Sequence, residues 1–229
     1  MGLHIVWDWN GTLLDDLAIV VESLNVGTAA LGFPAIDEDG YRDHFTRPVR
    51  AFYDSLFGRP VSDSEWDHLN HTFHVEYYSR VARAQLTVGA VEAVERVSAL
   101  GWSQSLLSMS VHDQLLDAVT ERGIADRFAM IDGLTVPTGG LKSEHLQTHL
   151  SSLEQDPAST LLIGDTPDDA VAARQVGAGV VLYDGGSHHL PTLSAMGAPV
   201  AHTLGEAVDL ALRLVGQENL EPYTRRVDG

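Results

Sequence analysis

Two acidic segments of the chain carry side chains that could act as nucleophiles or metal ligands. One runs from Asp8 to Asp16 directly after the apolar residues 3–7, and the other runs from Gly164 to Asp169 directly after the apolar residues 161–163. A carboxylate that follows a strand of an open α/β sheet lies at the edge where ligands bind, and it can attack an electrophile. Gly11 permits a tight turn whose amides can face an anionic ligand.

Three of these carboxylates, those of Asp8, Asp165 and Asp169, are expected to converge at one edge of the sheet. Packed together, they would repel one another and raise each other's pKa values unless a cation neutralised them. Oxygen ligands of this kind suit Mg²⁺, so the sequence predicts a magnesium site. Asp15 is expected instead to cap the following helix, and Asp168 to place a favourable charge in a first helical turn.

Ser108 and Lys142 are the other candidates for chemistry. Ser108 follows Leu106-Leu107, at the end of another predicted strand, where a hydroxyl can bind a phosphoryl oxygen. Lys142 is the only lysine of the chain and opens a predicted helix. From that position its ammonium group can offset the carboxylate cluster and the charge of a transferring phosphoryl group.

Short apolar runs alternate with helical patterns along most of the chain. This alternation predicts βαβ units, a parallel sheet and an α/β fold. Glycines stand where the C-terminal caps of the predicted helices would lie. We expect strands at residues 3–7, 105–107, 128–131, 161–163 and 180–183, and helices at residues 91–100, 111–122, 143–153 and 168–176.

The stretch from about Asp15 to Val88 interrupts this alternation, because it shows helical patterns and no convincing strand. The helices are expected at residues 17–31, 49–57 and 64–83. Turn signals containing Gly and Pro separate them. We therefore predict two domains: a core made of residues 1–15 and 88–229, and an inserted helical cap made of residues 16–87.

The composition excludes several classes of protein. Of the 229 residues, 14 are Lys or Arg and 32 are Asp or Glu, which gives a formal charge of −18. Such an acidic surface repels nucleic acid and anionic lipid, so neither is an expected partner. The chain has no cysteine, and its first residues have neither the basic start nor the length of a signal peptide or a membrane span. A cytoplasmic location is expected.

Taken in series, the candidate residues resemble the motifs of the haloacid dehalogenase (HAD) superfamily, and the pattern covers nearly the whole chain. That family has Asp-x-Asp-Gly-Thr, then a Ser or Thr after the second strand, then a Lys, then Gly-Asp-x-x-x-Asp. The resemblance implies a Rossmann-like parallel sheet with an inserted helical cap, as in phosphoglycolate phosphatases and β-phosphoglucomutases. The matching residues are Asp8, Gly11, Thr12, Ser108, Lys142, Asp165 and Asp169.

The resemblance also implies roles for these residues. Asp8 would attack phosphorus to give an aspartyl-phosphate, with Lys142 as a second catalytic residue. Mg²⁺ would be bound by Asp8, the main-chain carbonyl of Asn10 and Asp165, with Asp169 supporting the site. The phosphoryl group would be bound by Gly11, Thr12, Ser108, Met109 and Lys142.

Asn10 departs from the family pattern. At this catalytic position phosphatases of the superfamily have a second Asp, which serves as general acid and base, and an amide cannot transfer a proton. Such assistance is worth roughly 10²–10⁴-fold in rate. Three interpretations stay open: an enzyme that uses another acid or a good leaving group, a slow or non-catalytic phosphate binder, and an altered Asn-Gly site whose functional form has Asp.

The expected activity is hydrolysis of a small phosphorylated metabolite, with phosphoglycolate or a sugar phosphate as candidate substrates. In cap-bearing members of the superfamily, residues of the cap select the substrate. Arg47 and Arg50 are the candidates here, because an arginine next to a proline turn can bind a carboxylate or a second phosphate. The expected assembly is a monomer or a homodimer.

Overall fold

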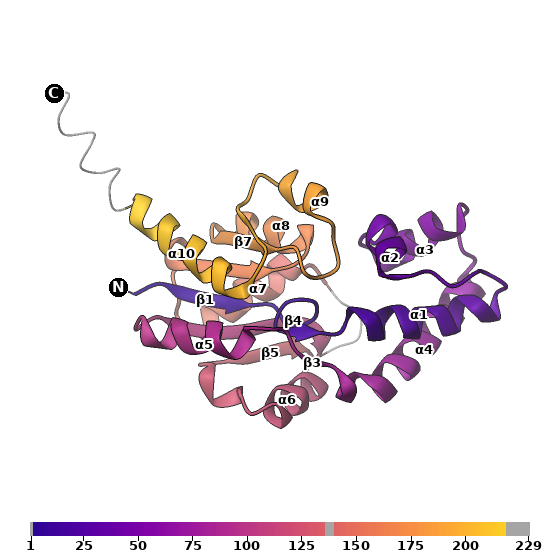
Figure 1. Cartoon of the computed structure of the whole chain (residues 1–229), viewed down its shortest axis with the longest axis horizontal. Coiled ribbons are helices and arrows are strands. Elements are labelled where there is room, and N and C mark those ends of the chain that lie inside the picture. Colours follow the sequence, from indigo (N-terminus) through magenta and orange to yellow (C-terminus); the bar gives the residue numbers. More distant parts are fainter. Residues whose placement is uncertain (1, 136–139, 219–229) are drawn as a thin grey trace.

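A parallel β-sheet forms the centre of the molecule (Figure 1). The computed structural model describes residues 2–135 and 140–218. Within these residues the sheet has six strands in the order β5-β4-β1-β6-β7-β8, and every neighbouring pair is parallel. The strands are β1 (His4–Trp7), β4 (Ser103–Val111), β5 (Ile131–Leu134), β6 (Thr160–Gly164), β7 (Gly179–Tyr183) and β8 (Val200–Ala201).

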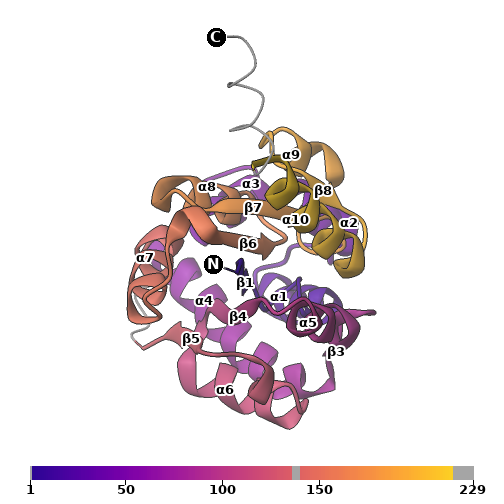
Figure 2. The ribbon, with the colours of Figure 1, turned by 90° about the vertical axis from the view of Figure 1, so that its left-hand side faces the viewer.

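Helices cover both faces of the sheet, as Figure 2 shows along the strands. Successive side chains of a strand point to opposite faces. Ile5 and Trp7 therefore pack into one apolar cluster with α5, α6 and α10, whereas Val6 packs into a second cluster with α7, α8 and α9. The helices are α5 (Ala90–Ala99), α6 (His112–Glu121), α7 (Lys142–Ser152), α8 (Pro167–Val176), α9 (Leu190–Ser194) and α10 (Leu204–Glu218).

Four further helices form a separate body beyond the carboxyl end of the sheet (Figure 1). They enclose an apolar cluster of their own, which includes Leu24, Tyr41, Phe52, Tyr53 and Leu69. Two short antiparallel strands, β2 (Leu14–Asp15) and β3 (Gln85–Leu86), connect this body to the sheet. The helices are α1 (Leu17–Ala30), α2 (Glu38–His44), α3 (Val49–Phe57) and α4 (Asp63–Arg80).

The structure confirms the predicted α/β class, with a Rossmann-like core and a helical cap. The helix predicted at residues 49–57 is α3 (Val49–Phe57) itself. The strand predicted at residues 128–131 was misplaced, because β5 spans Ile131–Leu134 after a 3₁₀ turn at Ala125–Arg127. The expectation of no strand between Asp15 and Val88 was also wrong, since β3 lies there. The predicted domain boundaries stay a prediction.

None of the helices within the described ranges has both the length and the apolar character that a membrane span requires.

A partly buried chain of hydrogen bonds joins β1, β4, β5 and α7 on the face of the sheet that α7 covers. His4 Nδ1 lies 2.7 Å from Ser103 Oγ, and His4 Nε2 lies 2.8 Å from Ser105 Oγ. His149 Nε2 lies 2.7 Å from the same Ser105 oxygen, and its Nδ1 lies 2.6 Å from Asp132 Oδ2. Every member is satisfied if each hydroxyl group and each ring N–H donates in the same direction, toward the Asp132 carboxylate. This arrangement requires one defined tautomer of each histidine ring.

We predict that His4 makes the fold sensitive to acid. Burial, with a smaller contribution from His149, lowers the pKa of His4 from 6.5 to about 4. Between pH 6.5 and pH 4 His4 is therefore protonated in the unfolded chain and neutral in the folded chain. The free energy of unfolding falls as the pH falls through this window. This single group should remove about 2 kcal/mol of unfolding free energy between pH 7 and pH 5.

Urea unfolding of the wild type and of His4→Gln at pH 5, 6 and 7 measures this contribution, because other titrating groups cancel in the difference. The variant should show a shallower pH dependence of its unfolding free energy. Equal slopes for the two proteins would contradict the prediction.

Candidate active site

The candidate active site lies at the carboxyl end of the sheet, at the point between β1 and β6 where the order of the strands reverses. From β1 the sheet continues to β4 on one side, and from β6 it continues to β7 on the other side. A switch point of this kind opens a crevice beyond the strand ends, which is where ligands bind in open α/β sheets. The backbone N–H of Asp8 donates to Ile163 O at 2.9 Å, so Asp8 and Asp165 emerge from adjacent strands.

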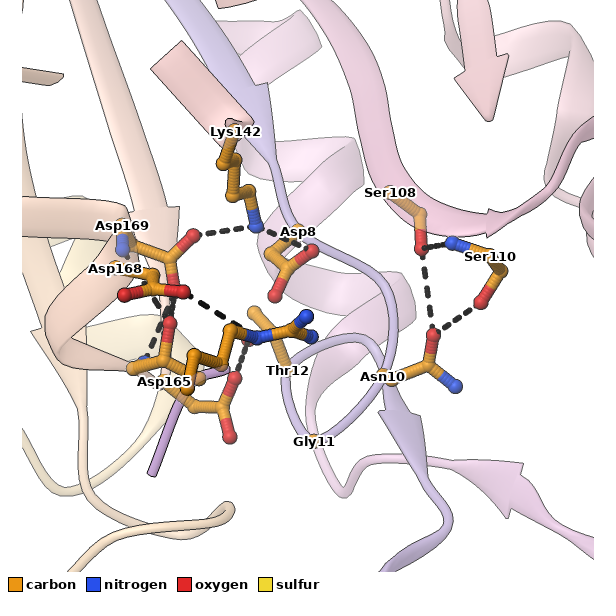
Figure 3. Close-up of polar contacts among 12 residues, drawn as sticks. Asp8, Asn10, Gly11, Thr12, Ser108, Ser110, Lys142, Asp165, Asp168 and Asp169 are labelled. Atoms are coloured by element: carbon orange, nitrogen blue, oxygen red, sulfur yellow. Dashed lines mark hydrogen bonds and ion pairs between the residues drawn. The ribbon is translucent and has the colours of Figure 1, made fainter. Parts of the chain in front are cut away.

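Lys142 connects two of the three predicted metal-binding carboxylates (Figure 3). Its Nζ lies 2.8 Å from Asp8 Oδ1 and 2.5 Å from Asp169 Oδ1, and all three side chains are buried. Lys142 is the first residue of α7, and Asp169 lies in the first turn of α8. Packing of α7 against α8 on the same face of the sheet brings the ammonium group to the carboxylates.

Asp165, the third carboxylate, is enclosed by glycines and backbone. The N–H of Ser187 donates to Asp165 Oδ2 at 2.7 Å, and Thr12 Oγ1 donates weakly to Oδ1 at 3.4 Å. A Cβ atom on Gly11 or on Gly186 would collide with the Asp165 carboxylate. Gly11 also has a φ of +68°, a backbone conformation that favours glycine. Both glycines are therefore required for the loops to close around Asp165.

The cluster holds more negative charge than its own lysine can neutralise. Oxygen atoms of Asp8, Asp165 and Asp169 lie within 4.8 Å of one another. Burial raises the pKa of Asp8 to about 6, and burial together with the charges of Asp8 and Asp169 raises the pKa of Asp165 to about 8. Burial opposes ionisation of Asp169 too, but Lys142 holds its pKa below the ordinary value. Such a site can hold a cation, which would favour the ionised form of every carboxyl group.

Asn10 is fixed by four hydrogen bonds that define the orientation of its amide. Its Oδ1 accepts from Ser110 Oγ at 2.6 Å and from Ser108 Oγ at 3.3 Å (Figure 3). Its Nδ2 donates to Asp16 Oδ2 at 2.7 Å and to the hydroxyl of Tyr77 at 2.6 Å. The reverse orientation would place a carbonyl oxygen against the Asp16 carboxylate, so only this one satisfies the network.

Asp16 is the acceptor at the centre of this network. It also accepts from the Tyr77 hydroxyl at 2.6 Å and from the backbone N–H of Gly11 at 2.9 Å. Burial raises the pKa of Asp16, although these hydrogen bonds oppose the shift. Because Tyr77 lies on α4 and Asn10 follows β1, the network ties the four-helix body to the strand end that carries Asp8.

The predicted phosphate-binding groups lie around Asp8, but several already have partners. The Gly11 amide donates to Asp16, and the Thr12 amide donates to Trp9 O at 3.2 Å. Ser108 Oγ accepts from the N–H of Ser110 at 3.1 Å in addition to its contact with Asn10. Met109 lines the same cavity as Asp8 and Lys142. Phosphate binding by these residues stays a prediction.

The two arginines predicted to select the substrate differ in position. Arg47 Nε lies 3.3 Å from Asp168 Oδ2, so it links the four-helix body to α8. The guanidinium group of Arg50 donates to Val61 O and to Asp63 Oδ1, each at 2.8 Å, and so binds within the four-helix body. Both side chains line the cavity above Asp8.

This arrangement agrees with a match to a known family. The family model for haloacid dehalogenase-like hydrolases matches residues 5–183, which include Asp8, Lys142, Asp165 and Asp169. The chain belongs to the haloacid dehalogenase-like hydrolase family.

Two relatives of this HAD hydrolase are similar to it over almost their whole length. A phosphoglycolate phosphatase of Mesorhizobium japonicum is 26% identical over 218 residues, covering 92% of this chain and 96% of the relative. A probable phosphatase, IndB, of Dickeya dadantii is 23% identical over 227 residues and covers 92% and 94%. Among solved structures, a HAD-like hydrolase of Streptococcus pneumoniae aligns with a TM-score of 0.77 at 21% identity, covering 91% of this chain and 98% of that chain.

Several residues of this site were missed by the sequence analysis. Asp16, Ser110 and Tyr77 complete the surroundings of Asn10, and Ser187 binds Asp165. Tyr77 is separated from Asn10 by 67 positions, and no local pattern marks it. Asp16 itself was the usable signal. Of the two adjacent acids Asp15 and Asp16 before an apolar helix, only one is needed to cap the helix, so the other carboxylate requires a hydrogen-bond partner elsewhere.

We predict that Asn10 and Asp16 act as a matched pair. Asn10→Asp alone replaces the donor of a 2.7 Å hydrogen bond with a second carboxylate, which should cost about 1–3 kcal/mol of unfolding free energy. The exchange variant Asn10→Asp with Asp16→Asn restores one amide and one carboxylate, and should recover most of the loss. Denaturant unfolding of the three proteins measures both effects. A double variant no more stable than the single one would contradict the pairing.

Proposed function

We propose that this HAD hydrolase is a Mg²⁺-dependent phosphatase that cleaves phosphate monoesters through an aspartyl-phosphate on Asp8. The observation that supports this proposal best is the contact of Asp8 with Lys142 at 2.8 Å, in a buried cluster with two further carboxylates. An ion pair of this kind keeps Asp8 ionised, although burial raises its pKa to about 6. At neutral pH Asp8 is therefore a carboxylate that can attack phosphorus.

Lys142 has a second role in this proposal. It is the only lysine of the chain, and Asp169 and Asp8 together hold its pKa above the ordinary value despite burial. It therefore remains a cation through any physiological pH. A fixed ammonium group beside the nucleophile can bind a phosphoryl oxygen and compensate for the negative charge of the transferring group.

The residues present fit a divalent cation, because three buried carboxyl groups share a single lysine and two of them have raised pKa values. Asp8, Asp165 and the main-chain carbonyl of Asn10 would bind Mg²⁺, and Asp169 would support the site through Lys142. When bound, the ion would supply charge compensation for the phosphoryl oxygens. Gly11 and Gly186 leave the space that the Asp165 carboxylate occupies, since a Cβ atom at either position would collide with it.

The names of the relatives support the choice of a phosphate ester as substrate. The alignments with two phosphoglycolate phosphatases cover more than 90% of this chain, and the relative from Dickeya dadantii is a probable phosphatase. A slow or non-catalytic phosphate binder is the second candidate, and it is favoured by Asn10, whose amide cannot protonate a leaving group. The hydrogen bonds from Asn10 to Asp16 and Tyr77 favour asparagine as the working residue over an altered aspartate.

Phosphate release tests the proposal directly. The wild type, assayed with Mg²⁺ against a panel of phosphate monoesters, should release phosphate catalytically. Asp8→Ala should lose at least about 10³-fold in kcat/KM because it lacks the nucleophile. Ligand binding without turnover, with a phosphoryl group trapped on Asp8 in the mass spectrum, would instead support the binding protein.

Mg²⁺ binding can be tested without turnover. Saturating Mg²⁺ should raise the midpoint of thermal unfolding of the wild type by about 5 °C or more, because a ligand that binds only the folded state stabilises it. Asp165→Asn should lose this shift. Asp168→Asn is the matched control, since its exposed carboxylate lies three residues away and pairs with Arg47. A shift that persists in Asp165→Asn would exclude this metal site.

A further inference from the structure

The cavity above Asp8 is large and mainly aromatic on the side of the four-helix body. It has a volume of about 1020 Å³ and reaches from Asp8, Asn10 and Lys142 to helices α1–α4. That volume lies at the upper end of the range of about 300–1000 Å³ found for small-molecule sites. Phosphoglycolate, an ester of a two-carbon acid, would leave most of it unfilled. The aromatic wall on this side includes Phe45, Phe52, Tyr53, Trp66, Phe73 and Tyr78.

The core side of the cavity also presents apolar side chains to the opening. Leu141 is 62% exposed and Val171 is 41% exposed, and both line the cavity. Large apolar side chains that remain exposed beside a buried polar site are a feature of ligand pockets, where they are covered when the ligand binds. An apolar organic group would therefore be buried from both sides.

The cations along the described wall of the cavity already have anionic partners. Arg47 pairs with Asp168, Arg50 pairs with Asp63, and Lys142 pairs with Asp8 and Asp169. The acidic partners of Arg47 and Arg50 already offset the charges of these two side chains, so a second carboxylate or phosphate on the substrate would meet little net positive charge there. This distribution of charge favours a substrate whose only anionic group is the phosphoryl group next to Asp8.

Asn10 adds a constraint on the bond that breaks. Its amide is held by Asp16, Tyr77, Ser108 and Ser110, and it has no proton to give to a departing oxygen. Without a proton donor, the rate depends on how stable the leaving oxyanion is. A phenol ionises near pH 10, as tyrosine does, whereas an alcohol is about as weak an acid as water and leaves as a far less stable anion.

We propose that the preferred substrate is a small aryl phosphate, the phosphate monoester of a phenolic hydroxyl group. This inference rests on the proposed phosphatase function. A carboxylate oxygen of Asp8 forms a bond to phosphorus while the bond from phosphorus to the aryl oxygen breaks, and the electron pair leaves with the aryloxide. Water then attacks the phosphorus of the aspartyl-phosphate and gives up its proton to the solvent, where the aryloxide is protonated. The products are the phenol and inorganic phosphate, and Asp8 is restored.

Two substrates of similar size test the leaving group. Phenyl phosphate and cyclohexyl phosphate both carry a six-membered ring, but only the first releases a phenoxide. For the wild-type protein with Mg²⁺, kcat/KM should be at least about 100-fold higher for phenyl phosphate, as is expected when general acid assistance is missing. The exchange variant, Asn10→Asp with Asp16→Asn, should reduce this ratio. A wild-type ratio near one would overturn the proposal, even if the protein is an active phosphatase.

Binding to the cavity is tested without any turnover. In Asp8→Asn, titration calorimetry should show that 2-naphthyl phosphate binds at least tenfold more tightly than phosphoglycolate. Tighter binding of phosphoglycolate would overturn the aryl preference, whether or not the protein hydrolyses either compound. Failure of every ester to be hydrolysed would instead refute the proposed phosphatase function, so the two failures can be told apart.

An alanine substitution in the aromatic wall tests where the aryl ring of the substrate binds. Trp66→Ala should raise the KM for 2-naphthyl phosphate about tenfold or more, since a lost apolar contact of this size weakens binding of the ring. The Ki of inorganic phosphate as product inhibitor should not change. Trp102→Ala is the matched control, because Trp102 is partly buried against the core outside the cavity lining. Equal KM values for the two variants would contradict an aryl site at the wall, and thermal unfolding checks that both remain folded.

Discussion

The ion pairs of Lys142 with Asp8 and Asp169 are the interactions on which the rest of the site depends. An isolated buried carboxylate is costly, and three in one cluster could not remain ionised without a cation. Lys142 supplies one positive charge and leaves Asp165 with a pKa raised to about 8. The fold therefore keeps a deficit of positive charge at the strand ends, and this deficit is what would draw in a divalent ion.

The position of that deficit follows from the order of the strands. β1 and β6 are neighbours at the centre of the sheet, and their polar residues emerge on the same edge. α7 and α8 pack on one face and bring Lys142 and Asp169 to that edge from outside the strands. Residues that are more than 130 positions apart in the sequence thus meet within a few ångströms. Close packing of α7 and α8 against the sheet places their first turns at these distances.

Much of this organisation could be predicted from the sequence, because it depends on local patterns. Apolar runs followed by Asp8 and Asp165 mark strands and their ends, and the helical repeat before Gly177 marks α8. What could not be predicted depends on contacts between distant segments. Tyr77 meets Asp16 only because α4 packs against α1, and no spacing in the sequence encodes that contact.

Other errors have local causes. α2 was missed because Glu38–His44 is short and contains only one buried residue, Tyr41, so it lacks an apolar repeat. The short strands β2 and β3 are each two residues long, and pairing with each other defines them. The sequence analysis assigned no role to the loop with Gly186 and Ser187, yet His188 within it is only 5% exposed. Close approach of the backbone to Asp165 is the reason for Gly186, and it becomes visible only in three dimensions.

The pairing of β2 with β3 has a consequence for how such a protein can change over evolution. Leu14 lies opposite Leu86, and the N–H of Thr87 donates to Leu13 O at 2.9 Å, so the chain leaves the sheet and returns to it side by side. The cost in chain entropy of an insertion grows only slowly with its length when its ends are held together. Helices α1–α4 can therefore be replaced as a unit by helices of different length that line the cavity with different residues. Asp8 and Lys142 would then stay unchanged, while the residues that line the cavity are replaced.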